Sequence, residues 1–163
     1  MLKYYDGSTL SEASFVDTPF IYGHRKAGGG TITAGAYQFA VVARWTDGYG
    51  NIHRSVPYIA TYSLGVDSVQ LLIGGITVTN KEKVKQTNAM NNVVLEIYQT
   101  ELSGTVLYLQ DTIANVKFSN SFYFMTNAAI KTDTEILYTQ SGELENDAPT
   151  IGNYVTKFKN RIW

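Results

Sequence analysis

The chain has 163 residues, of which 44% are hydrophobic and 17% are charged, and its formal net charge at pH 7 is −1. The balance of 13 basic and 14 acidic side chains excludes a function in which bulk positive charge holds a nucleic acid. The absence of cysteine excludes disulfides, cysteine-bound metal centres and thiol catalysis.

The chain is rich in threonine, valine and isoleucine and contains 12 tyrosines. The branched or flat side chains of these residues suit strands better than helices. The longest apolar runs are far shorter than the roughly 20 residues that a membrane helix needs. The composition therefore predicts a soluble, mostly β protein, with neither a membrane nor a nucleic acid as its partner.

Residues 1–26 are predicted to form a lead-in that belongs to a flanking region. Two short strand-like pieces lie on either side of Asp6-Gly7, a dipeptide that favours a tight hairpin turn. A hairpin of this size is marginally stable alone, so we expect it to pack on the main domain or on a neighbour. The glycines at 28–30 then mark a flexible break and a domain boundary.

The segment 37–45 is the clearest strand of the chain, because its apolar side chains alternate and so share one face. This face consists of Tyr37, Phe39, Val41, Ala43 and Trp45. A turn-rich stretch at 46–51 and a returning strand at 52–56 complete a hairpin. Pro57 lacks an amide donor, which places it at a strand end or an edge.

A second hairpin is predicted from 92 to 111. Val93, Leu95 and Ile97 should face the core, with Leu107 or Tyr108 opposite them. The predicted core anchors of the whole domain are Tyr37, Phe39, Trp45, Leu95 and Ile97.

Short strands with regularly spaced turn signals, and no long amphipathic helix, predict an all-β fold, an antiparallel sandwich of the immunoglobulin or fibronectin type III class. We expect this β-sandwich to span residues 27–126. Residues 127–163 are expected to form an extension that contains a linker and a truncated strand of a flanking region.

Catalytic and cofactor sites are not expected. His24 and His53 lack the spacing of a zinc protease, and no nucleophile elbow is present. A structural hydrogen bond is the better interpretation of His53. Calcium remains an alternative where carboxylates gather, at Glu143, Glu145 and Asp147 or at Asp47 with Asn51, although ordinary turn chemistry explains both groups.

The tip of the first hairpin is the candidate interaction surface, because its polar and aromatic residues follow a confident strand. These residues are Asp47, Tyr49, Asn51, His53 and Arg54. Tyr49 is the aromatic residue expected to be most exposed. Exposed aromatic rings also stack on sugars, so glycan binding remains an alternative.

Several strings, in consistent order, resemble large structural proteins of tailed-bacteriophage tails. Residues 35–57, with Trp45-Thr46-Asp47 followed by Gly50-Asn51, resemble a "WTDxxGNxHRSxP" stretch of that family. Residues 94–108 resemble its "VxIYRT…GxxYY" hairpin, 137–146 its "LYTTGGxLEN" segment and 159–163 its "KNRLW" strand. The chain departs from these patterns at Gln99 and at Gln140-Ser141.

The resemblance implies a fibronectin type III-like domain flanked by β-propeller-like segments, with the strand order possibly permuted. It implies a non-catalytic structural domain of a virion tail protein, acting as a scaffold or spacer. The partners would be other virion proteins and the rest of its own polypeptide, in a homo-oligomeric parent. The rival expectations are an adhesion module for host-surface glycan and an accessory domain of an enzyme.

Overall fold

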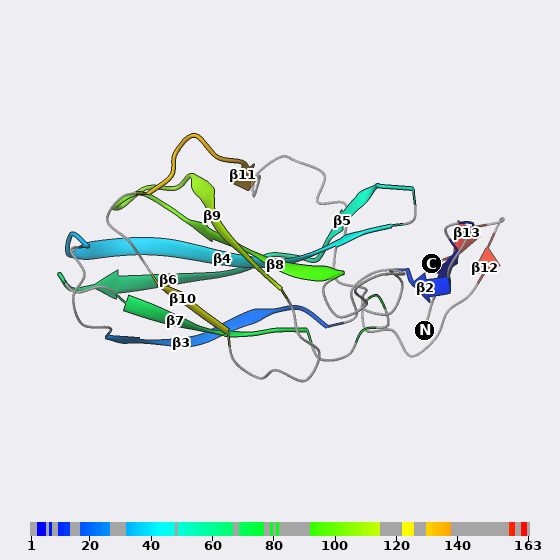
Figure 1. Cartoon of the computed structure of the whole chain (residues 1–163), viewed down its shortest axis with the longest axis horizontal. Helices are drawn as coiled ribbons and strands as arrows, with labels where there is room; N and C mark the ends of the chain where they lie inside the picture. Colours follow the sequence, from blue (N-terminus) through cyan, green and yellow to red (C-terminus); the bar gives the residue numbers. More distant parts are fainter. Residues whose placement is uncertain are drawn as a thin grey trace.

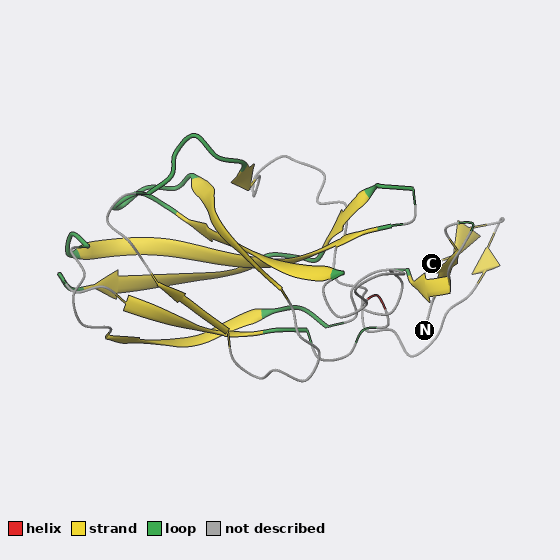
Figure 2. Ribbon diagram, viewed as in Figure 1, coloured by secondary structure: helices red, strands yellow, loops and turns green. Residues whose placement is uncertain are grey.

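A computed structural model describes residues 3–5, 7, 10–13, 17–26, 32–47, 49–66, 69–76, 79, 81, 92–114, 122–125, 130–137, 157–158 and 161–162. The described part is all β, apart from one 3₁₀ residue at Lys81, and every strand pairing in it is antiparallel (Figure 2). No helix among these residues is long and apolar enough to cross a membrane.

Among the described residues, thirteen strands form four sheets, and Figure 1 shows the chain order of the strands. The strands are β1 (Lys3–Tyr5), β2 (Leu10–Glu12), β3 (Phe20–Lys26), β4 (Gly35–Thr46), β5 (Ile52–Arg54), β6 (Tyr58–Leu64), β7 (Val69–Gly74), β8 (Val93–Gln99), β9 (Leu107–Ala114), β10 (Phe122–Met125), β11 (Ile136–Leu137), β12 (Lys157–Phe158) and β13 (Arg161–Ile162).

The larger sheet has the order β11-β9-β8-β4-β5, with β6 also paired to β4. The smaller sheet has the order β10-β7-β3. Two short hairpins, β1-β2 and β12-β13, lie at one end of the molecule (Figure 1).

One edge of β4 is shared by two strands. Residues 35–41 pair with β6 and residues 44–46 pair with β5. Between these two ladders, the Ala43 amide donates to Ser55 Oγ at 2.9 Å and the Ser55 amide donates to the Ala43 carbonyl at 2.8 Å. The Ser55 hydroxyl thus accepts the Ala43 amide, which would otherwise bond to a backbone carbonyl of a neighbouring strand.

The main core lies between the two sheets. Ile21, Leu71 and Ile73 come from the smaller sheet. They pack with the alternating face of β4 and with Val93, Leu95 and Ile97 of β8. All five sequence-predicted anchors belong to this core and are buried: Tyr37, Phe39, Trp45, Leu95 and Ile97.

The expected partners of β8 across the second hairpin are wrong. Leu95 pairs with Ile113 and Ile97 with Asp111, whereas Leu107 packs on the opposite face of the sheet with Tyr98. A register irregularity between Ile97 and Tyr98 shifts the pairing. Because side chains alternate with period two, such a shift exchanges the faces of all residues beyond it.

The central sheets also use strands from outside residues 27–126. β3, in the segment expected to be a lead-in, pairs with β7 through residues 20–26. β11, in the segment expected to be an extension, pairs with β9. The predicted hairpin around Gly7 is present as β1-β2, with Gly7 at φ 91°.

Candidate interaction surface

The tip of the β4-β5 hairpin is organised around one buried carboxylate. Asp47 is buried, and its Oδ1 accepts the backbone amides of Tyr49 at 2.9 Å and Asn51 at 2.8 Å. Its Oδ2 accepts the Asn51 side-chain amide and His53 Nε2, both at 3.0 Å. Both carboxylate oxygens are therefore used to hold the loop in one conformation.

These contacts also decide the charge of Asp47. Burial alone would raise the pKa of the Asp47 carboxyl, but the hydrogen bonds from His53, Asn51 and Tyr49 outweigh it. Together they hold that pKa well below its usual range. Since the carboxylate stays ionised at neutral pH, it accepts all four bonds and the His53 ring donates from Nε2.

The loop presents Tyr49, whose residue exposure of 69% is the highest among the large hydrophobic residues of the described chain. Its hydroxyl end lies against the turn of the β1-β2 hairpin, where a side chain on Gly7 would clash with it. The lead-in hairpin therefore packs on the tip of the main domain, one of the two outcomes expected from its small size.

A second set of contacts, made by Glu12, also holds the lead-in hairpin against the main domain. Glu12 of β2 is buried, and its carboxylate accepts the Thr79 hydroxyl while its carbonyl accepts Lys81 Nζ. Lys81 Nζ also lies 4.3 Å from the ring centroid of Trp45. His53 also lies beside this indole, with ring centroids 5.2 Å apart.

Arg54, the last residue of the predicted surface, points into a different cluster. Its Nε donates to Glu96 Oε2 at 2.8 Å and its guanidinium reaches Glu135 at 2.6 Å. Glu96 is only 1% exposed, and it also accepts the Tyr98 hydroxyl at 2.9 Å and lies 3.2 Å from Arg44 Nε. Burial, and secondarily the Glu96 charge, raises the pKa of the Tyr98 hydroxyl.

The five predicted surface residues thus divide into two groups. Asp47, Asn51 and His53 form one hydrogen-bonded loop with Tyr49 at its tip, whereas Arg54 joins the buried Glu96 on the outer face of the sheet. The pairing of Arg54 with Glu96 was not anticipated. The sequence contains a basic residue in β5 and an acidic residue in the predicted second hairpin. These two residues suggest an ion pair only when both strands are known to pair with β4.

The alternatives for calcium fall in two places. Glu143, Glu145 and Asp147 lie outside the described residues. At Asp47 both carboxylate oxygens accept hydrogen bonds from amide and ring N–H groups. These donors occupy the positions around the carboxylate that a bound cation would need. Within the described part of the chain, no three His, Asp or Glu side chains gather as a metal site.

Comparisons with known proteins found no matching protein family, no matching curated protein and no matching solved structure.

Proposed function

We propose that this chain is a structural and interaction domain of a tailed-phage virion protein, built as a fibronectin type III-like sandwich and acting by presenting rigid loops and sheet edges to neighbouring subunits. The supporting observation is the loop at the hairpin tip. Asp47 holds it in one conformation, and Tyr49 projects from it. A preorganised loop loses little conformational freedom on binding, which favours recognition by another protein.

Strand order supports the fibronectin-like assignment. In immunoglobulin-like domains that have a C′ strand, strands G, F, C and C′ lie in one sheet and strands A, B, E and D lie in the other. The order β6-β4-β8-β9 resembles the first, and β3-β7-β10 resembles the second without its strand D. In the chain, the F and G equivalents β4 and β6 stand between the A and B equivalents, so the order is permuted.

The disposition of the aromatic rings favours a scaffold over a glycan receptor. Trp45, Tyr37 and Phe39 are buried in the core. Among the described residues, the exposed rings are Tyr5, Phe20, Tyr22, Tyr49 and Tyr58, and of these only Phe20 and Tyr22, on β3, lie side by side, with 5.9 Å between centroids. A sugar-binding platform needs several rings side by side on one surface.

The proposal is tested on particles of the virus that encodes the chain, by cross-linking followed by mass spectrometry. We expect the chain at a fixed stoichiometry in the particle, with cross-links from Lys3 and Lys131 to other virion proteins. The Tyr49→Ala variant should reduce incorporation of the neighbouring subunit while the isolated chain stays folded, although the contact with Gly7 is lost. Absence of the chain from particles, or binding to a glycan array that Tyr49→Ala abolishes, would refute the proposal.

A further inference from the structure

One side of the molecule leaves an edge of each sheet without a strand partner among the described residues. There, β6 pairs only with β4, and β3 pairs only with β7. The two edges are neighbours, since the rings of His24 and Tyr62 lie 4.6 Å apart between centroids. Such edges present rows of backbone N–H and C=O groups that can accept a further strand.

The β6 edge lacks the features by which proteins usually protect an edge strand. Its seven residues, Tyr58–Leu64, include no charged residue and no proline. Tyr58 and Ile59 are 40% and 43% exposed. Short length, lysines, prolines or bulges are the usual protections, so this strand is suited to strand addition.

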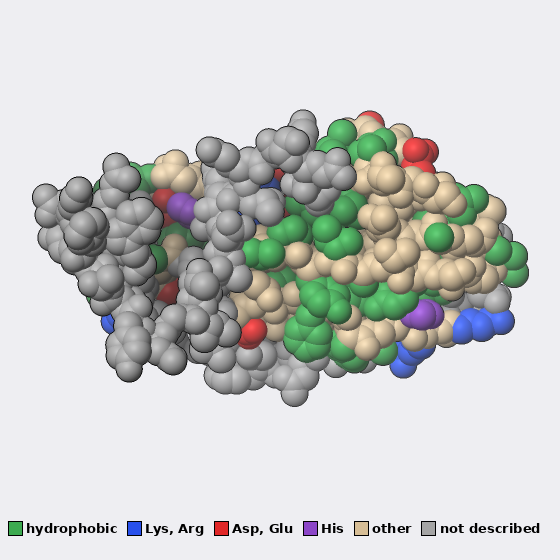
Figure 3. Space-filling model, turned by 180° about the vertical axis from the view of Figure 1, so that it is seen from behind, with side chains coloured by type: hydrophobic (Ala, Val, Ile, Leu, Met, Phe, Trp, Pro, Cys, Tyr) green, Lys and Arg blue, Asp and Glu red, His purple; other side chains and the backbone are tan. Residues whose placement is uncertain are grey.

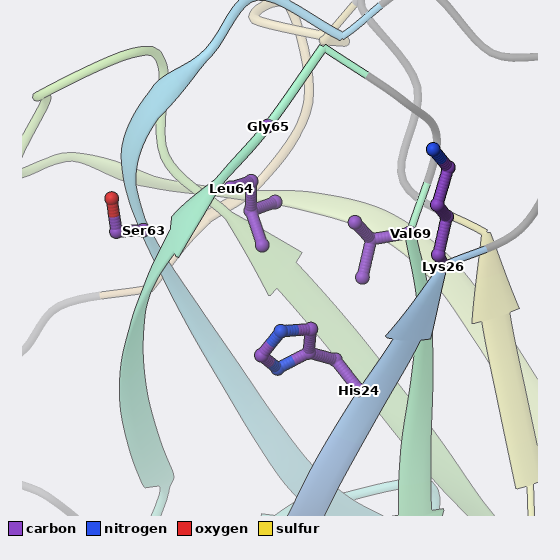
Figure 4. Close-up of a pocket in the computed structure, with 6 residues that line it drawn as sticks. All are labelled: His24, Lys26, Ser63, Leu64, Gly65 and Val69. Atoms are coloured by element: carbon purple, nitrogen blue, oxygen red, sulfur yellow. The ribbon is translucent and has the colours of Figure 1, made fainter.

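Positive charge lies at the end of this edge where β3 closes. Arg25 and Lys26 are exposed there, next to His24, which is also exposed. Figure 3 shows Lys, Arg and His side chains together at that end of the molecule. In Figure 4, His24 and Lys26 rise from β3 across from Leu64, around a pocket of about 190 Å³ whose remaining lining residues are Ser63, Gly65 and Val69.

We infer that the β6 edge takes up an extended segment of a neighbouring polypeptide, running antiparallel to β6 and carrying acidic side chains near its N-terminus. This inference rests on the proposed function and names the chemistry of the partner. The antiparallel direction continues the pairing of the whole sheet. It sets the N-terminus of the added strand beside Leu64, where the cations of β3 lie.

The alternation of β6 defines which residues of the partner meet those cations. Tyr58, Ala60 and Tyr62 pair with residues of β4 that face the core, and Leu64 itself belongs to the core. The residues of an added strand that lie opposite Leu64 and Tyr62 face the same side. Acidic side chains belong at these two positions, and apolar side chains belong opposite Ala60 and Tyr58.

The experiment uses the full chain and two capped peptides of identical composition. The forward probe is acetyl-Asp-Thr-Glu-Thr-Val-Thr-Val-amide, and the control is the same sequence reversed. We expect the forward peptide to bind about tenfold more tightly than the reversed peptide. Its binding should also slow hydrogen exchange of the β6 amides. A forward peptide with alternate backbone nitrogens methylated should lose binding, because it cannot complete the ladder.

Charge reversal separates this inference from nonspecific attraction. Lys26→Glu should lower the affinity for the forward peptide about tenfold. It should raise the affinity for a version of that peptide with lysines in place of the acidic residues. Lys3→Glu is the matched control, in β1, and should change neither affinity. Both variants replace exposed side chains, so loss of folding is not expected.

Three results would overturn the inference. Equal binding of the two peptides, or protection of strands other than β6, would refute strand addition at this edge. Sedimentation showing a dimer whose β6 amides are already protected would identify a second copy as the occupant. A change in the signals of the Tyr58 and Tyr62 side chains when maltohexaose is added would identify the edge as a sugar site. The particle cross-linking decides the proposed function independently, since peptide binding needs no virion.

Discussion

Both faces of β4 and β8 carry buried residues, but the two faces are stabilised in different ways. The inner face of β4 and β8 carries Phe39, Val41, Trp45, Leu95 and Ile97, packed on the smaller sheet. The outer face combines a small apolar cluster at Ala40, Val42, Tyr98 and Leu107 with the buried Glu96 and its two arginines. Apolar packing tolerates many partners, whereas a buried carboxylate depends on specific ones.

The outer face owes its burial to a segment distant in sequence. Residues 130–137 lie on β9, where the Lys131 amide donates to Gln110 Oε1 at 3.0 Å and the Leu109 amide donates to the Glu135 carbonyl at 2.8 Å. Leu137 packs on the outer cluster. β3 covers part of the inner face and residues 130–137 cover part of the outer face, although Ile130 of this segment also packs against the inner core.

The largest effect is expected from removing these covers. Deleting residues 1–26 removes β3 and buried Ile21 from the inner face, and we expect the chain to lose its folded state, a loss above about 5 kcal/mol. Deleting residues 127–163 should leave a folded but less stable chain. Circular dichroism with urea titration measures both. A folded chain lacking residues 1–26 would show that the predicted boundary after residue 26 is also a folding boundary.

Within the intact chain, the inner face is tested by Trp45→Ala. The indole is 1% exposed and contacts both His53 and Lys81, so its removal leaves a large cavity. We expect the free energy of unfolding to fall by about 3–5 kcal/mol. Val106→Ala, at an exposed position, is the control and should change it little. A loss below 1 kcal/mol for Trp45→Ala would contradict the assignment of this residue as a core anchor.

The outer face is tested by Glu96→Gln. The substitution keeps the shape of the side chain but removes the charge that Arg54 and Arg44 face, so we expect a loss of about 1.5–3 kcal/mol. A double-mutant cycle with Arg54→Met should show coupling, because the two side chains share two contacts. Additive losses would mean that Glu96 acts through Arg44, Tyr98 or packing and not through Arg54.

The loop at the end of β4 is tested by acid. Because the folded pKa of Asp47 lies below its unfolded value, the carboxylate contributes stability that is fully present above the unfolded pKa and is lost as pH falls toward the folded one. Asp47→Asn should cost about 1–2 kcal/mol at pH 7 and reduce the slope of stability against pH below about pH 4. An unchanged acid profile would show that the loop does not depend on this carboxylate.

The smallest effect is expected at Lys81, the cation beside the inner face. Burial lowers the pKa of Lys81 to about 8 despite the opposing pull of Glu12. Between the folded value and the ordinary value near 10.5, the unfolded chain binds more protons, so stability should rise with pH there. Lys81→Met should remove this rise in urea titrations at pH 7.5 and 9.5. The same rise in the variant would assign it to another group.

The sequence predicted the inner face well and the outer face poorly. Alternation from Tyr37 to Trp45 marks the inner face because one strand carries the whole signal. In β4, Ala40 and Val42 are also buried, but their cover comes from residues 130–137, which show no strong periodicity. The register of β9 depended on an irregularity at Ile97 that no local pattern marks.

The candidate surface was predicted in part for the same reason. Turn chemistry connected Asp47 with Asn51, and a structural hydrogen bond was expected for His53, although its partner, Asp47, was not predicted. The partners of Arg54 and Tyr49 are Glu96 and Gly7, 42 residues away in each case. Contacts at such separations follow from the fold rather than from local sequence.

The division of the β4 edge at Ser55 has a consequence for how the chain can diversify. Because β5 and β6 pair with separate stretches of β4, the hairpin tip can change its length or composition without altering the β6 register. Insertions between residues 47 and 52 would enlarge the presented loop while the sheet behind it keeps its pairing. The length and sequence of the tip can thus vary independently of the pairing between β4 and β6.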